Sequence, residues 1–135
     1  MSTVGKEAPL GVVYDTGALI AAERNDRRMW ALHDRALARG VIPIVPAGCV
    51  VEAWRGDRQV SLSRLLAGCA TEPLDGEVAR RTGAILGATT HAAGAVDATV
   101  VEVALRRAGV VVTADRDDLM ALARGVRRRL SIIDI

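Results

Sequence analysis

Short runs of apolar, mostly β-branched residues recur along this 135-residue chain, and they constrain its fold more than any other feature. Each run is long enough for a buried strand and too short for a buried helix. The four clearest runs cover residues 12–14, 41–45, 110–113 and 132–135, and a weaker candidate covers residues 69–74. Strands that are apolar on both faces need cover on both faces, so these runs predict an interior sheet.

Segments with the apolar periodicity of helices separate the predicted strands. The stretch GVVYDTGALIAA, residues 11–22, is typical of a strand that leads directly into a helix. Further helices are predicted at residues 29–37, 49–54, 62–67, 77–90, 98–107 and 118–124. Strands that are connected through helices pair in parallel. We therefore predict a single α/β domain over residues 12–135, with a parallel sheet of four to five strands flanked by helices, and a flexible N-terminal extension over residues 1–11.

The composition is that of a globular protein. Half of the residues are hydrophobic and a quarter are charged. No apolar run approaches the roughly 20 residues of a membrane span, so we expect a cytoplasmic protein that does not enter a membrane. The two cysteines, Cys49 and Cys69, are expected to be reduced and buried, and the isolated His33 and His91 cannot complete a zinc site.

The charged residues limit the kinds of partner. Lys6 is the only lysine, and the arginines bring the net charge to +2, which permits an acidic or phosphate-bearing partner. The chain has no Phe, one Tyr and two Trp, which is too few for the aromatic platform on which proteins stack single-stranded RNA.

Four carboxylates from distant parts of the sequence are predicted to meet at one edge of the sheet. Asp15 ends the first strand, and Asp115 lies two residues beyond Thr113, the end of a later strand. Asp97 opens the helix that leads into that later strand, and Glu52 lies in the helix after the second strand. Sites in open α/β sheets form outside the carboxyl ends of the strands, which is where these acids fall.

Each acid also has a purely structural interpretation. Asp15, Asp97 and Asp115 are all plausible helix N-caps, with Asp115 and Asp118 forming an acidic version of the capping box. Glu52 could be a surface residue near Arg55 or Arg58. The remaining acids are interpreted as solvated faces or caps: Glu23, Asp26, Asp34, Asp57, Asp75, Glu77, Glu102 and Asp134.

Convergence of the four acids would change this interpretation. Their mutual repulsion would raise some of their pKa values and destabilise the fold unless a cation lies among them. Oxygen ligands without His or Cys select Mg²⁺ or Mn²⁺. A divalent ion in such a place suits phosphodiester hydrolysis, because it activates water and offsets charge that develops on the phosphate.

Four segments, taken in order, resemble the PIN domain and, more narrowly, the VapC ribonuclease toxins of toxin–antitoxin pairs. They are VVYDTGALIAA, VEAW, AVDATVVEVALRRAGVVVTADRDDL and LSIIDI, and the resemblance covers residues 12–135. It implies a nuclease domain in which Asp15, Glu52, Asp97 and Asp115 bind one or two Mg²⁺ or Mn²⁺ ions and cleave RNA with metal-activated water. Asp15 and Asp97 would be the principal ligands.

The same resemblance implies supporting residues and shows two departures. Thr16 and Thr113 neighbour the first and fourth acids, and Asp117 and Asp118 are either further contributors or simple caps. Gly17 stands where relatives often carry a polar residue, and Glu52 is followed by AWRG rather than the commoner Leu-containing sequence.

The resemblance also implies partners, namely an RNA substrate, a VapB-type antitoxin and a second copy of the chain in a homodimer. We expect the antitoxin to contact Trp54. An acidic centre that binds a polyanion needs a basic rim, and ordinary surface charge is the alternative interpretation of these arginines. The candidates for RNA contact are Arg55, Arg58, Arg116, Arg124 and Arg127, with Arg128 and Arg129 beside the last.

Several other activities fail on specific residues. A receiver domain needs a lysine late in the chain, and a haloacid-dehalogenase-type phosphatase needs Asp-x-Asp after the first strand; this sequence has neither. It also has no P-loop motif and no G-x-S-x-G motif of the serine hydrolases. Two alternatives stay open. One is a metal-free ribonuclease that uses His33 and His91 as acid and base, and the other is a catalytically inactive PIN-like module for RNA binding or assembly.

Overall fold

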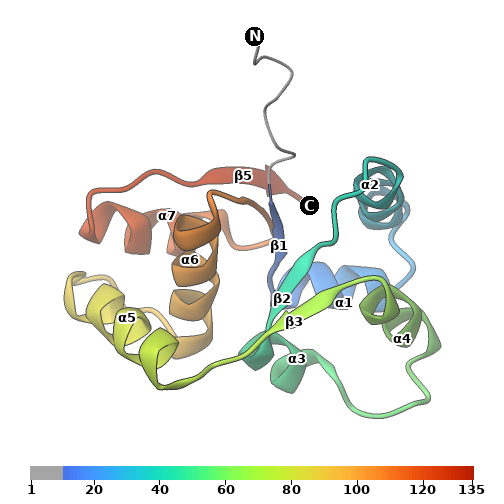
Figure 1. Ribbon diagram of the computed structural model, residues 1–135, viewed down its shortest axis with the longest axis horizontal. Coiled ribbons are helices and arrows are strands. Elements are labelled where there is room, and N and C mark those ends of the chain that lie inside the picture. The colour runs from blue at the N-terminus through green and yellow to red at the C-terminus, as the bar shows by residue number, and fades with distance from the viewer. Residues whose placement is uncertain (1–10) are drawn as a thin grey trace, which may run out of the picture.

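Residues 11–135, which the computed structural model describes, form a five-stranded parallel sheet with seven helices packed against it (Figure 1). Apart from Gly11, the expected N-terminal extension lies outside the described residues. The strands are β1 (Val12–Tyr14), β2 (Ile44–Pro46), β3 (Ala70–Glu72), β4 (Val110–Thr113) and β5 (Ser131–Asp134). The helices are α1 (Thr16–Glu23), α2 (Arg27–Ala38), α3 (Ala47–Ala53), α4 (Val60–Ala67), α5 (Gly76–Gly87), α6 (Ala95–Arg107) and α7 (Arg116–Gly125).

The strand order is β3-β2-β1-β4-β5, and every neighbouring pair is parallel. The predicted α/β class and parallel sheet are therefore confirmed. The first and fourth strands have the predicted bounds, but the second begins at Ile44 rather than at residue 41. The Val41 amide donates to the Ala36 carbonyl and so completes the end of α2, and Pro43 has no amide with which to join the ladder.

The core lies on both faces of the sheet. Figure 1 shows α5, α6 and α7 on one side of the strands and α1, α2 and α4 on the other. Val13 and Val111 are fully buried. Helix α6 is buried almost all round, because it lies between the sheet and α5 and α7. Of the helices between residues 11 and 135, none combines the length and the hydropathy that a bilayer-spanning helix needs.

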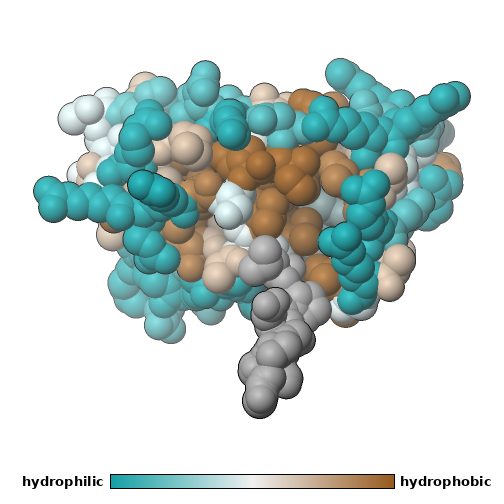
Figure 2. Space-filling model, turned by 90° about the horizontal axis from the view of Figure 1, so that it is seen from above, coloured by the Kyte–Doolittle hydropathy of each residue, from teal (hydrophilic) through white to brown (hydrophobic). Residues whose placement is uncertain are grey.

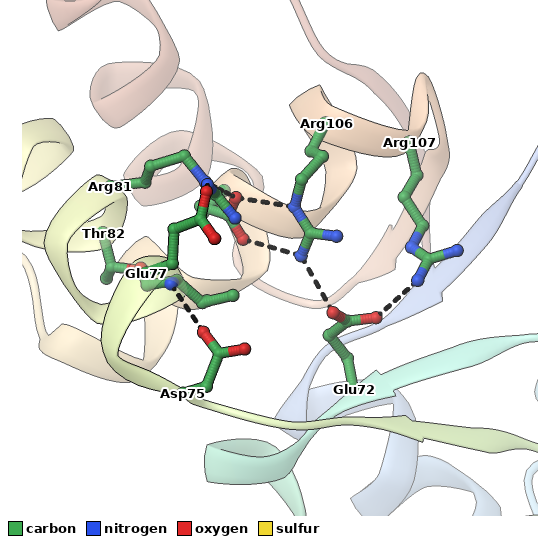
Figure 3. A network of polar contacts seen from close by, with 9 residues as sticks. Glu72, Asp75, Glu77, Arg81, Thr82, Arg106 and Arg107 are labelled. Atoms are coloured by element: carbon green, nitrogen blue, oxygen red, sulfur yellow. Dashed lines mark hydrogen bonds and ion pairs between the residues drawn. The ribbon is translucent and has the colours of Figure 1, made fainter.

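Glu102 is the clearest error of the sequence interpretation. The sequence predicts a solvated face or a cap for it, but its side chain is 3 % exposed, between α5 and α6. It accepts hydrogen bonds from Arg81 Nε at 2.9 Å and from Arg106 Nε at 2.8 Å. Arg106 also donates to Glu72 of β3 at 3.0 Å (Figure 3), so one buried carboxylate connects two helices to the edge of the sheet. Helical periodicity does not reveal this role. Arg81 belongs to another helix, 21 residues away in the sequence, and Arg106 is one turn away on a helix face that carries both apolar and charged residues.

Replacement of Glu102 by Gln is expected to destabilise the fold. Burial alone raises the pKa of Glu102, but the hydrogen bonds from Arg106 and Arg81 outweigh burial and hold the pKa below its usual value. Because both arginines are partly hydrated, we expect Glu102→Gln to lower the free energy of unfolding by about 1–2 kcal/mol at neutral pH. Thermal melts measure the loss, and it should shrink as the pH falls below the ordinary glutamate pKa of 4.5, since a depressed carboxyl stabilises only while ionised.

Glu77→Gln is the matched control. Glu77 also pairs with Arg81, at 2.8 Å, but its side chain is 78 % exposed. An exposed pair of this kind contributes less than about 0.5 kcal/mol. Equal effects of the two substitutions would contradict the role given to Glu102.

Candidate metal centre

Three carboxylates lie together at the carboxyl edge of the sheet. Asp97 lies in the first turn of α6, Asp115 follows β4 by two residues, and Asp118 lies in the first turn of α7. Each offers one oxygen, and these oxygens all lie within 4.8 Å of one another. The sequence predicts two of the three, Asp97 and Asp115, as ligands, and it allows Asp118 to be either a contributor or a cap.

Neither Asp97 nor Asp115 caps a helix through its side chain. Helix α6 begins one turn earlier than expected, with Gly94 at the N-cap, so Asp97 is already inside the helix. Asp115 occupies the N-cap position of α7 but makes no capping hydrogen bond, and its own amide donates to Thr113 Oγ1 at 2.7 Å. The capping interpretation is therefore wrong for Asp97, and for Asp115 it holds for the position but not for the side-chain hydrogen bond or the acidic capping box. Neither carboxylate is compensated by a capping hydrogen bond.

Asp15 is held differently from this trio. Its side chain caps α1, as the structural interpretation proposed, with Oδ1 accepting from the Ala18 amide at 2.9 Å. Its Oδ2 accepts from the Thr113 hydroxyl, which joins the ends of β1 and β4. Asp15 is 4 % exposed, and it is close enough for its charge to raise the pKa values of Asp97 and Asp115. It borders the trio without belonging to it.

Glu52 also borders the trio. Its Oε1 accepts a hydrogen bond of 2.6 Å from the Thr16 hydroxyl, and its charge contributes to the raised pKa of Asp97. Among the described residues it forms no ion pair with Arg55 or Arg58, since the Arg55 guanidinium donates to the carbonyls of Val51 and Trp54. Thr16 and Thr113 thus each hold one of the bordering acids.

Burial and mutual repulsion raise the pKa values of the clustered acids. Burial first, and then the charges of Asp115 and Asp118, raise the pKa of Asp97 to about 6. Burial and a hydrogen bond with Asp118 raise the pKa of Asp115. Burial also raises the pKa of Asp15, although the Thr113 and Ala18 hydrogen bonds act against it. The folded chain therefore holds more negative charge at this edge than it compensates.

His91 is a residue of this centre that the sequence analysis did not assign to it. Its Nε2 lies 2.7 Å from Asp118 Oδ1, and this contact lowers the pKa of Asp118. The residue lies in the segment between α5 and α6, with its amide bonded to Thr89 Oγ1 at 3.0 Å. A lone histidine 27 positions from its partner carries no signal in the sequence.

The donor set suits a hard divalent cation. All three clustered side chains offer carboxylate oxygen, the ligand that Mg²⁺ and Mn²⁺ prefer. Cys49, which is buried nearby in α3, is not a competing thiolate, because burial and the neighbouring acids raise its pKa to about 12. Asp117 is exposed, and its charge adds to the raised pKa of Asp115.

The structure excludes His33 from the metal-free ribonuclease alternative. His33 is 2 % exposed and is bonded through Nδ1 to the Tyr14 hydroxyl at 2.9 Å. Burial lowers its pKa, so it is a neutral core residue. His33 and His91 do not form an acid–base pair. Cys49 is buried as expected and Cys69 is partly exposed, and both are free thiols.

The other predicted site residues lie on several elements of the fold. Arg116 lies beside Asp115 and forms an ion pair of 3.5 Å with Asp134. Arg124 lies eight residues further along the chain at the other end of α7, which is about 12 Å along the helix axis. Arg127 follows the end of α7, and Arg58 is exposed in the segment between α3 and α4. Trp54 ends α3 and packs partly against the core.

Gly17 is explained by close packing. A Cβ at this position would lie 3.0 Å from the Ala114 Cβ and 3.4 Å from Asp15 Oδ1. A larger residue would push apart the two segments that carry Asp15 and Asp115. Close packing at this edge of the site therefore accounts for Gly17, where relatives often carry a polar residue.

Comparison with solved structures identifies the fold. No family model and no curated protein sequence matches the chain. A chain of VapBC2 from Rickettsia felis bound to promoter DNA matches with a TM-score of 0.72 at 10% identity, over 93% of this chain and 98% of that one.

Two further structures agree. A chain of DNA-bound VapBC from Salmonella typhimurium gives a TM-score of 0.65 at 17% identity, covering 93% and 98%. A chain of FitAcB from Neisseria gonorrhoeae gives 0.61 at 19% identity, covering 90% and 96%. The chain has the fold of the VapC-type PIN toxins, as its sequence segments predict.

The repulsion at this site makes metal-free stability depend on pH. Folding raises the pKa of Asp97 from 3.8 to about 6, so the folded state holds more protons than the unfolded state between these values. Stability in EDTA should therefore fall as the pH rises through this window, by about 1 kcal/mol after screening. Asp97→Asn should remove this part of the fall. It should also remove the rise in Tm that Mn²⁺ gives the wild type.

Asp57→Asn is the matched control for these melts, because Asp57 is exposed and makes no hydrogen bond within residues 11–135. It should behave as the wild type at every pH and with Mn²⁺. If Asp97→Asn melted in parallel with Asp57→Asn throughout, the site would not be a centre of repulsion or of metal binding.

His91 is expected to support metal binding by holding Asp118 in place against Asp115. Partners that orient metal ligands are worth about 10- to 100-fold in affinity. We expect His91→Ala to weaken Mn²⁺ binding by at least about tenfold in calorimetry, and His91→Gln, which keeps a donor, to recover part of the loss. Thr90→Ala, an exposed neighbour, is the control. Affinities that match this control in both His91 variants would show that the contact is incidental.

Proposed function

We propose that this chain is a metal-dependent endoribonuclease and the toxin of a type II toxin–antitoxin pair. The observation that carries the proposal is the position of the Asp97, Asp115 and Asp118 carboxylates, which lie together at the carboxyl edge of a VapC-type PIN sheet with only His91 of the described residues to compensate them. The fold by itself supports only the class of protein. The three acids support the chemistry.

Asp97, Asp115 and Asp118 would hold Mg²⁺ or Mn²⁺, as one ion or two, with Asp15 and Glu52 beside them. A divalent ion at such a site lowers the pKa of a bound water and offsets the charge that develops on the phosphate. The chain itself keeps the bordering carboxylates in place, through Thr113 on Asp15 and Thr16 on Glu52. These two hydroxyls limit the motion of acids that otherwise repel each other.

Arginines near the centre would bind the RNA backbone. Arg116 adjoins Asp115, and Arg55 and Arg58 follow the helix that carries Glu52. Their charge would offset the repulsion between a polyanion and the carboxylates, and contacts of this kind make binding dependent on salt. Arg124 and Arg127, about one helix length away, would extend this contact along the RNA.

The proposed protein partners follow from the similar structures. These are described as VapBC and FitAB complexes, so we propose a VapB-type antitoxin as the partner of this chain, with Trp54 in the contact. A homodimer and a cytoplasmic location belong to the same proposal. Trp54 ends the helix that carries Glu52, so a segment bound there would lie beside the acids.

Cleavage of mixed RNA tests the proposed activity. The purified full-length chain, incubated with total RNA and Mg²⁺ or Mn²⁺, should produce discrete new 5′ ends that sequencing can map. EDTA should abolish the cuts, and Asp97→Asn should reduce them at least about 100-fold, because loss of a ligand removes several kcal/mol of transition-state stabilisation. Asp57→Asn, the exposed control, should cut as the wild type does.

Two results would contradict the proposal. Cleavage that persists in EDTA and in Asp97→Asn would indicate a metal-free activity or a contaminant. Absence of cleavage by a folded, antitoxin-free chain that binds Mn²⁺ would favour the alternative, an inactive PIN-like module that binds RNA or assembles with other proteins.

A further inference from the structure

One face of the sheet is incompletely covered. Alternating residues of the central strands point to opposite faces, and the register pairs Val12 with Val110 and Val112 with Ile133. On the face toward α6, Val13 and Val111 are fully buried. On the opposite face Val12, Val110 and Ile133 keep part of their surface exposed, although they belong to the same strands.

A groove lies over this second face, between the strands and α2. Its volume is about 290 Å³. Eight of its ten lining residues are apolar or aromatic. The other two are Arg35, which lies in α2, and Arg39, which caps the C-terminal end of α2. Figure 2 shows the molecule from this side, with a continuous hydrophobic surface framed by hydrophilic side chains. The apolar residues of the groove are Val12, Tyr14, Leu32, Ala36, Val41, Val110, Val112 and Ile133.

Helix α2 cannot close this groove. The Tyr14 hydroxyl bonds to His33 of α2 at 2.9 Å and fixes the helix at one side of the face. Two other apolar side chains near the end of α2 are exposed, Leu37 at 42 % and Ile42 at 62 %. Exposed apolar surface rimmed by polar residues marks sites of protein association.

The shape and the charges of the groove select among possible ligands. Pockets for small molecules bury most of the ligand and fix its orientation with a few precisely placed polar groups. This groove is lined by apolar side chains apart from Arg35 and Arg39 on one side, which suits the apolar face of a protein segment. Arg35 and Arg39 are four residues apart on one side of the helix, about 6 Å along its axis. Neither forms an ion pair with any residue between 11 and 135. A symmetric pairing through this groove would place the same positive charge on both sides of the interface, which disfavours a second copy of this chain relative to an acidic partner.

We propose that this groove binds an amphipathic helix of a partner protein, with aliphatic side chains on the face that enters the groove and acidic residues on the edge that faces α2. Parallel sheets are normally covered by helices, so a helix completes the missing layer. Acids spaced three or four residues apart on it would match Arg35 and Arg39. The inference does not depend on the proposed nuclease activity, because it uses no residue of the metal centre.

Selection from a phage-displayed library of short helical peptides tests the inference on the full-length chain. The enriched peptides should combine aliphatic residues at helical spacing with Asp or Glu beside them. In fluorescence anisotropy, Arg35→Glu with Arg39→Glu should weaken their binding at least about tenfold, as reversal of two paired charges does. Arg27→Glu with Arg28→Glu, at the exposed start of the same helix, carries the same change of charge and should leave binding within about twofold.

Nuclear magnetic resonance and sedimentation decide what occupies the groove. Addition of an enriched peptide should shift the methyl signals of Val12, Val110 and Ile133, and the free chain should not associate through this face. The inference would be overturned if no peptide were enriched, if lysine-rich peptides bound equally well, or if both charge-reversed variants behaved alike. It would also be overturned if residues 1–10 or a second copy already protected these methyl groups in the free protein.

Discussion

Parallel pairing of β1, β2 and β4 is the constraint on which the rest of the structure depends, because it brings the ends of all three strands to one edge of the sheet. The segments that follow these strands carry Asp15, Glu52, Asp115 and Asp118, and the first turn of α6 brings Asp97 to the same edge. Repulsion among these acids is therefore built into the topology. The fold compensates two of them with hydroxyl donors, Thr113 for Asp15 and Thr16 for Glu52. The trio of Asp97, Asp115 and Asp118 has only His91 as a compensating group among the described residues. That imbalance is the physical basis for a cation at this edge.

Much of this arrangement was predictable from the sequence, because apolar runs and the rule for strand ends depend on local pattern. The predicted strands at β1 and β4 have the observed bounds, and Asp115, which follows β4, lies with Asp97 in the cluster that Asp15 borders. One error is local, because Gly94 rather than Asp97 is the N-cap residue of α6. What else the sequence leaves open or predicts wrongly involves contacts between distant residues, since the place of Asp118 depends on His91, 27 positions away. Glu102 was misassigned for the same reason, since Arg81 reaches it from another helix.

The strands connect the two surfaces to which we assign binding. Tyr14 lies in the floor of the apolar groove, and the next residue, Asp15, borders the metal centre. On β4, Val112 lines the groove, and the next residue, Thr113, bonds to Asp15 beside the candidate metal centre. The carboxyl end of the sheet therefore holds uncompensated negative charge, and one of its faces holds exposed apolar surface flanked by arginines. Such different surfaces suit the two partners that we propose, an RNA with a metal ion at the edge and an acidic helix on the face.

The central claim is that the carboxylates at the sheet edge hold a divalent cation, and Mn²⁺ tests it through its paramagnetism. Substoichiometric Mn²⁺ added to the isotope-labelled chain broadens the amide signals nearest to the bound ion, with Mg²⁺ as the diamagnetic reference. The account predicts that broadening begins at Asp97, Asp115 and Asp118, extends next to Asp15 and Glu52, and is lost in Asp97→Asn. Broadening that is uniform, or centred on other exposed acids such as Asp57, would contradict it.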